Sequence, residues 1–161
     1  METVVHRAAE ISLPQRQALK TYVKLMRASS SVTVRMHRHL KIDGLTGSQF
    51  GVLEALYHLG PLCQQEIGNK ILKTGGNMTL VIDNLEKRGL VERIQDTQDR
   101  RYLIIHLTPQ GQHLIRRVFL RHAGIAENVF SALDGIEQEQ LGRLLKKLGR
   151  AATNMHETSI E

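Results

Sequence analysis

The chain has little of what several protein classes require. A single cysteine, Cys63, excludes an internal disulfide framework and a zinc site built from several cysteines. No apolar run approaches the roughly 20 residues that span a bilayer. The amino terminus, METVVHRAAEISLPQ, also lacks the apolar core of a signal peptide. We therefore expect a soluble cytoplasmic protein that does not enter membranes.

Motifs of common enzyme classes are absent as well. The sequence contains no G-x-x-x-x-G-K-[ST], G-x-G-x-x-G, H-E-x-x-H or G-x-S-x-G pattern. No two histidines stand four apart on a predicted helix, and His37 and His39 are expected on different faces. We expect neither an enzyme nor a bound metal or cofactor. A metal sensor assembled from dispersed histidines by folding is the alternative.

Positive charge is what the chain has in excess. Its 161 residues suit one domain with an oligomerisation extension, here 1–161, and carry a formal net charge of +6. This charge favours a polyanionic partner, either nucleic acid or an anionic membrane surface.

Helical spacing dominates the first half of the chain. Apolar residues at steps of three and four after Pro14 predict a long helix that continues to Leu40. Thr46 and Gln49 form a T-x-x-Q capping box for the next helix, which ends near Gly60. Two shorter helices follow, over 64–72 and 77–88, and this pair indicates a helix-turn-helix.

The period changes from helical to alternating after Gly89. Leu103, Ile105 and Leu107 are expected on one face of a strand whose hairpin partner is LVERIQ, with DTQDRR as the exposed connection. The helical period returns at Pro109. We therefore predict a mostly α fold with a small β-hairpin wing, and a winged helix-turn-helix over 46–108.

The outer helices carry more apolar surface than one small domain requires. The last helix spaces its leucines almost as a coiled-coil seam, and a stripe on the preceding helix is expected to reach Leu133. We predict that 14–43 and 109–156 form the interface of a homodimer. Packing within one subunit is the alternative, because stripe spacing alone does not separate the two cases.

A family resemblance covers about 14–155. The stretch LVERIQDTQDRRYLIIHLTPQG is similar to the wing signature of the MarR family of bacterial regulators, with its Asp-x-Arg tip and Leu-Thr-x-x-Gly helix start. The stretch NMTLVIDNLEKRGLVER resembles that family's recognition helix. The resemblance implies a homodimeric transcriptional regulator, usually a repressor, that binds a pseudo-palindromic site in double-stranded DNA. It also implies a small aromatic effector that binds between the dimer helices and the DNA-binding head.

The predicted recognition helix has one packed side, formed by Met78, Ile82 and Leu85 with Val81 at its edge. A helix of this width fits the major groove, where threonine and asparagine can bind base edges and leucine can contact a thymine methyl group. Family members often carry arginine in place of Leu80 and Asn84. An ordinary amphipathic surface helix is the alternative. The residues predicted to face DNA are Gly76, Asn77, Thr79, Leu80, Asp83, Asn84 and Lys87.

The wing tip combines acidic and basic residues. The resemblance assigns Arg101 to the minor groove, where an arginine reads groove width in A-T-rich DNA. Asp99 is expected to orient its guanidinium by a charge-assisted hydrogen bond. Arg88, Arg93 and Arg100 are predicted phosphate contacts. A solvated surface ion pair is the alternative for Asp99 and Arg101.

Cys63 precedes a predicted helix, with Glu66 completing a capping box. A thiol at a helix amino terminus feels the positive end of the dipole, so oxidation of Cys63 could release DNA. The alternative is a small buried apolar residue. A winged-helix protein-interaction module without sequence-specific DNA binding is the second hypothesis for the whole chain. Steep salt dependence distinguishes DNA binding from such an apolar contact.

Overall fold

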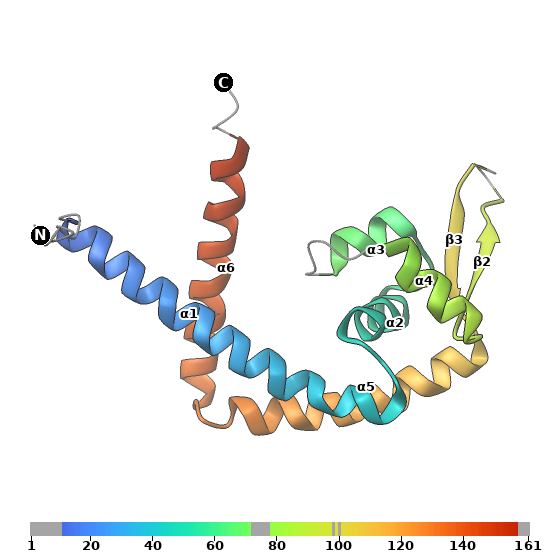
Figure 1. Ribbon diagram of the computed structural model, residues 1–161, viewed down its shortest axis with the longest axis horizontal. Coiled ribbons are helices and arrows are strands. Elements are labelled where there is room, and N and C mark those ends of the chain that lie inside the picture. Colours follow the sequence, from blue (N-terminus) through green and yellow to red (C-terminus); the bar gives the residue numbers. More distant parts are fainter. Residues whose placement is uncertain (1–10, 72–77, 98, 100, 158–161) are drawn as a thin grey trace, which may run out of the picture. The chain divides into compact units, whose positions relative to one another are not determined.

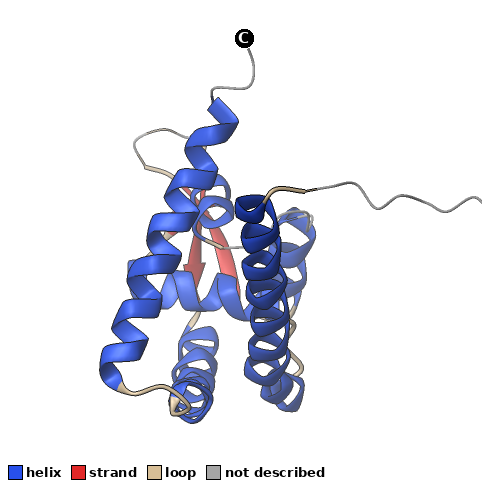
Figure 2. Ribbon diagram, turned by 90° about the vertical axis from the view of Figure 1, so that its left-hand side faces the viewer, coloured by secondary structure: helices blue, strands red, loops and turns tan. Residues whose placement is uncertain are grey.

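The computed structural model describes residues 11–71, 78–97, 99 and 101–157. Helices make up most of the chain, and the strands are confined to one small sheet (Figures 1 and 2). The predicted fold class, mostly α with a β-hairpin wing, is confirmed. The chain divides into two compact units, 1–35 and 36–161. The predicted site residues Gly76, Asn77 and Arg100 lie outside the described residues.

Helix α1 spans Leu13–His37 and has no buried residue. The predicted helix reached Leu40, but a 3-10 helix, η1, takes over at Arg38–Asp43. Gly44 ends η1 with φ at 62°, and the backbone N–H of Leu45 donates to the carbonyl of Leu40. This left-handed termination turns the chain, so Leu40 becomes a core residue of the second unit.

The second unit contains the predicted helix-turn-helix. Helix α2 (Gly47–Leu59) begins with the predicted capping box, in which Thr46 Oγ1 accepts from the Gln49 N–H at 3.2 Å. Helices α3 (Gln64–Lys70) and α4 (Met78–Lys87) follow. Their apolar sides meet α2 in a common core, which includes Leu53, Leu56, Ile67, Ile82 and Leu85.

The wing belongs to a three-stranded antiparallel sheet. Strands β2 (Val91–Gln95) and β3 (Leu103–Leu107) form the predicted hairpin, and β1 (Leu62–Cys63) pairs with the other edge of β3. Two residues are too few to show alternation, so no sequence pattern indicated β1. The predicted alternation along β3 holds only in part, because Ile105 is buried whereas Leu103 is exposed.

Two long helices complete the chain. Helix α5 spans Pro109–Phe130 and α6 spans Gly135–Glu157. The prediction that Leu133 continues the stripe of α5 is wrong, since the helix ends at Phe130 and a turn follows. The side chains of α6 are exposed as far as Asn154. Among the helices of the described ranges, none is long and apolar enough to cross a membrane.

Candidate nucleic-acid interface

Helix α4 has the two faces that its sequence predicts. Ile82 and Leu85 are completely buried, and Met78 and Val81 pack partly against the same core. On the other side Leu80 is 54% exposed and lies beside polar neighbours. Thr79 and Lys87 are exposed, and Asp83 and Asn84 are half-buried. The exposed face is therefore a mixture of hydrogen-bonding and apolar groups.

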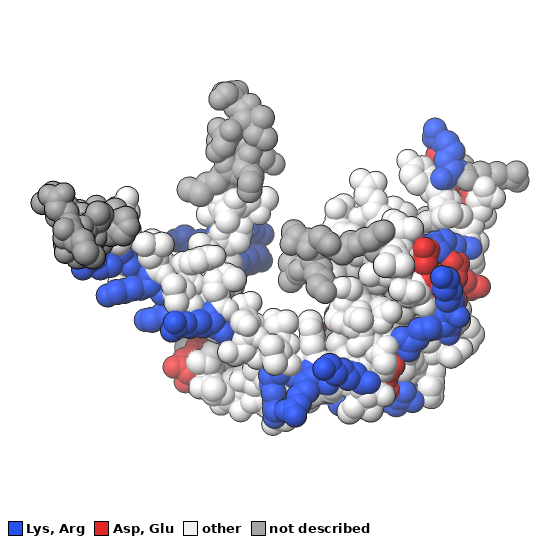
Figure 3. Space-filling model, viewed as in Figure 1, with Lys and Arg blue, Asp and Glu red and all other residues white. Residues whose placement is uncertain are grey.

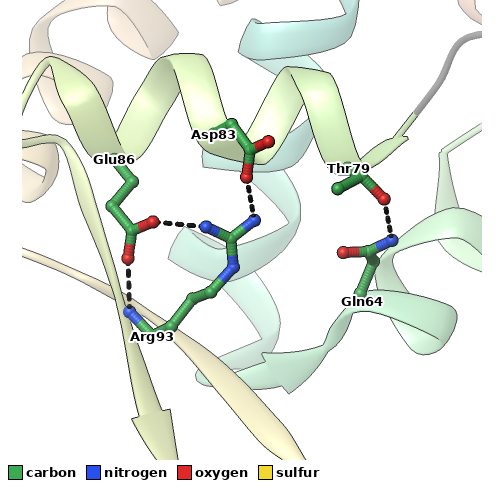
Figure 4. Close-up of polar contacts among 5 residues, drawn as sticks. All are labelled: Gln64, Thr79, Asp83, Glu86 and Arg93. Atoms are coloured by element: carbon green, nitrogen blue, oxygen red, sulfur yellow. Dashed lines mark hydrogen bonds and ion pairs between the residues drawn. The ribbon is translucent and has the colours of Figure 1, made fainter.

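Part of this face is engaged by neighbouring elements of the protein. Thr79, Asp83 and Glu86 follow one another at steps of four and three, so they share one side of the helix. Gln64, the first residue of α3, donates from Nε2 to Thr79 Oγ1 at 2.8 Å (Figure 4). Gln64 was not among the predicted site residues. The sequence signal that could have identified it is a polar residue at the start of the first helix of the helix-turn-helix.

Arg93 of β2 binds both acidic residues on this side of α4 (Figure 4). One guanidinium nitrogen lies 2.5 Å from Asp83 Oδ1, and the other donates to Glu86 Oε2. The backbone N–H of Arg93 also donates to Glu86 Oε1, at 3.2 Å. Partial burial alone would lower the pKa of Arg93, but the two carboxylates outweigh it and raise this pKa. The contacts attach the base of the wing to α4.

In the described part of the wing tip, Asp99 binds the exposed cation of Arg101. Arg101 has 85% of its side chain exposed, and its terminal nitrogen lies 2.7 Å from Asp99 Oδ2. Asp99 also accepts from the Arg101 Nε and backbone N–H, both at 3.0 Å. These hydrogen bonds lower the pKa of Asp99. The predicted contact between Asp99 and Arg101 is confirmed. Figure 3 shows basic surface at the tip and mixed charges near the base of the wing.

Arg88 is bound within the protein. Its guanidinium donates to the carbonyl oxygens of Gly44 at 2.8 Å and Asp43 at 3.1 Å. The Asp43 side chain is 6% exposed and accepts from Arg117 and Arg121 on α5, each at 2.8 Å. Through these contacts the end of α4, η1 and α5 are joined by charged groups.

Two histidines meet beside the core. The His39 and His122 rings have centroids 5.2 Å apart, and Phe50 stacks on His122 with centroids 4.5 Å apart. Burial lowers the pKa of His122, with smaller contributions from His39 and His37. Within the described ranges, no group of three or more His, Cys, Asp or Glu residues could hold a metal ion.

Cys63 lies at the junction of β1 and α3 and is half-buried. Its backbone N–H donates to Glu66 Oε2 at 2.8 Å, which makes Glu66 part of the predicted capping box. This hydrogen bond lowers the pKa of Glu66. The thiol is thus adjacent in sequence to Gln64, whose side chain binds Thr79 on α4.

Comparisons with known proteins agree on one class of protein, the transcriptional regulators. Residues 45–103 match the model of the MarR family. The chain is 40% identical to the uncharacterized HTH-type transcriptional regulator YkoM of Bacillus subtilis over 83% of this chain and 86% of that protein. It is 36% identical to the HTH-type transcriptional regulator MhqR of the same species, over 87% and 97%.

One similar solved structure concerns the regulation of DNA binding by a small molecule. It concerns the mechanism by which 6-hydroxynicotinic acid regulates DNA binding of Bordetella bronchiseptica BpsR. That structure is 26% identical and superimposes with a TM-score of 0.70, over 78% of this chain and 89% of that chain.

Proposed function

Because this chain belongs to the MarR family of helix-turn-helix transcriptional regulators, we propose that it is a cytoplasmic homodimeric repressor that a small aromatic ligand or oxidation releases from DNA. The family makes it a DNA-binding regulator. One observation carries the proposal furthest: the exposed face of α4 is attached by Arg93 to a wing whose tip presents Arg101. A single rigid head can then contact two grooves at once.

The geometry divides the predicted DNA contacts into two groups. Thr79, Leu80, Asn84 and Lys87 face the major groove, and Arg101 enters the minor groove. Asp83, Arg88 and Arg93 have protein partners, so they hold the reading surface in place. Asp99 aims Arg101. Gly76, Asn77 and Arg100 complete the proposed DNA contacts, next to the phosphates.

The exposed apolar stripes support dimerisation through the outer helices. On α1, Leu19, Tyr22 and Met26 are each at least half exposed, and on α6 Leu144 and Leu148 are too. Contiguous exposed apolar surface of this kind marks an interaction site. A two-fold dimer would bring two α4 helices to half-sites about one helical turn apart, which predicts a pseudo-palindromic operator.

The proposed class of effector follows from family membership. A small aromatic anion is the class of ligand that family membership suggests. The effect of 6-hydroxynicotinic acid on BpsR supports this ligand class. Oxidation of Cys63 is the second route, because a change at that residue would disturb α3. Either signal must favour the DNA-incompetent state to release DNA.

Selection of bound DNA from a random pool tests the proposal. We expect enrichment of a two-fold-symmetric site with an A-T-rich segment under each wing, and binding that weakens steeply as salt rises. On the selected site, Arg101→Ala is expected to weaken binding by about tenfold or more, whereas Arg116→Ala on the exposed face of α5 is not. Failure to enrich any sequence would exclude the proposed function.

A further inference from the structure

The side chain of Gln64 links the two helices of the helix-turn-helix at the surface that faces DNA. Its Nε2 donates to Thr79 Oγ1 at 2.8 Å, and the two residues are separated by 15 positions in the sequence. Figure 4 shows the amide nitrogen directed at Thr79 and the amide oxygen turned away from it. Gln64 is half-buried and Thr79 is exposed, so the pair lies at the edge of the reading surface.

The hydrogen bond restricts what Thr79 can offer. A free threonine hydroxyl rotates, and it can either donate or accept. When Gln64 donates to Oγ1, the hydroxyl hydrogen must point elsewhere, because it is repelled by the incoming N–H. Thr79 is then a donor with a defined direction. The amide oxygen of Gln64 remains an acceptor beside it.

We propose that Gln64 and Thr79 form one reading unit, in which Gln64 positions the Thr79 hydroxyl as a donor and supplies the adjacent acceptor. This inference deepens the proposed function and rests on it. The major-groove edge with an acceptor beside a donor is that of adenine, through N7 and the N6 amino group. Guanine presents two acceptors, N7 and O6, so its O6 would face the amide oxygen of Gln64 without a hydrogen atom between them. The unit therefore selects adenine over guanine.

The neighbouring acid does not compete for this role. Asp83 lies one turn further along the same side of α4, and its carboxylate is bound by Arg93 at 2.5 Å. A free carboxylate there would accept from a cytosine amino group and would repel phosphate. With Arg93 in place, the neutral Gln64 and Thr79 pair offers hydrogen-bonding groups on this side of the described helix.

Binding measurements with paired variants test the unit. Wild-type protein is first used to select an operator. Dissociation constants are then measured on this operator and on every single-base variant of one half-site, for wild type, Gln64→Ala, Thr79→Val and the double variant. We expect each single variant to weaken binding by about tenfold and to lose the adenine preference at the same base pair. The double variant should bind no more weakly than either single variant, since the two residues act together.

Two controls separate this role from general damage. Gln65→Ala removes an exposed glutamine from the same helix and should leave affinity and base preference unchanged. Thr79→Ser keeps the hydroxyl and should keep the adenine preference. Equal weakening on all sequences by Gln64→Ala, or free-energy losses that simply add in the double variant, would overturn the inference. If wild type selects a site that Gln64→Ala reads equally well, only this inference fails; if wild type selects no site, the proposed function fails with it.

Discussion

At the residue scale, a single glycine decides how the wing joins the long helix α5. Thr108 caps α5 by accepting from the Gly111 N–H at 3.0 Å, and its own hydroxyl donates to the Gly89 carbonyl at 2.6 Å. A Cβ atom at Gly111 would lie 1.9 Å from the Leu90 carbonyl oxygen. The Leu-Thr-x-x-Gly pattern is therefore explained by the close approach of two backbone segments.

Gly111→Ala is expected to destabilise the fold by roughly 3 kcal/mol, because backbone must move to admit the methyl group. Gly124→Ala is the matched control in the same helix, where an added Cβ would meet nothing within 4 Å. Alanine there should raise the free energy of unfolding by about 1 kcal/mol, since it favours helix. Urea unfolding at one protein concentration measures both. Equal stability of the two variants would contradict the proposed clash.

At the scale of elements, the wing and α4 act as one body because a charged contact joins them. Arg93 contributes its backbone N–H and its guanidinium to acids on α4. The sequence predicts Arg93 as a phosphate contact and Asp83 as a residue that faces DNA. The structure instead pairs these two residues with each other, which favours a positioning role for both.

Arg93→Met is expected to weaken operator binding by about tenfold or more, because two carboxylates next to DNA lose their partner and the wing loses its attachment. Adding Asp83→Asn and Glu86→Gln to this variant should restore part of the affinity by removing the unpaired negative charge. Titrations over a range of salt concentrations provide the measurement. Arg116→Met controls for the loss of one positive charge.

A phosphate contact would behave differently. Its loss would reduce the slope of log affinity against log salt by about one, and the two acid substitutions would raise affinity by the same factor in wild type and in Arg93→Met. That pattern would return Arg93 to the role predicted from the sequence.

At the scale of the whole molecule, several apolar residues of the outer helices are exposed, and the proposed dimer would bury them. Leu144 and Leu148 of α6 are 65% and 50% exposed. Their spacing of four places them on one stripe of the helix. A second copy of the chain would bury this stripe and also double the number of DNA-reading heads.

Replacing both Leu144 and Leu148 with glutamate is expected to give monomers in sedimentation experiments. Affinity for the two-half-site operator should fall by about a hundredfold or more, because the second head no longer binds at high effective concentration. Lys146→Glu places a glutamate at an exposed position on the opposite side of α6 and should preserve the dimer. A double variant that remains dimeric and binds normally would place the interface elsewhere.

Local patterns in the sequence were enough to predict most of the elements. The capping box at Thr46 and the packed side of α4 each depend on residues within a few positions of one another. The same holds for the pair of Asp99 and Arg101, which are two residues apart. Such features are decided by local backbone geometry and hydrophobic period, so they can be read without a structure.

Tertiary structure decided which polar groups face each other across elements. The contacts of Gln64 with Thr79, of Arg93 with Asp83, and of Asp43 with Arg117 join segments that are distant in sequence. Side-chain hydrogen bonds of this kind depend on how helices and strands pack, so the hydrophobic periodicity of the sequence does not predict them. The sequence by itself determined that this protein carries a winged helix-turn-helix. Only the packing decided which polar side chains of that unit bind one another, because those contacts join segments that are far apart in the chain.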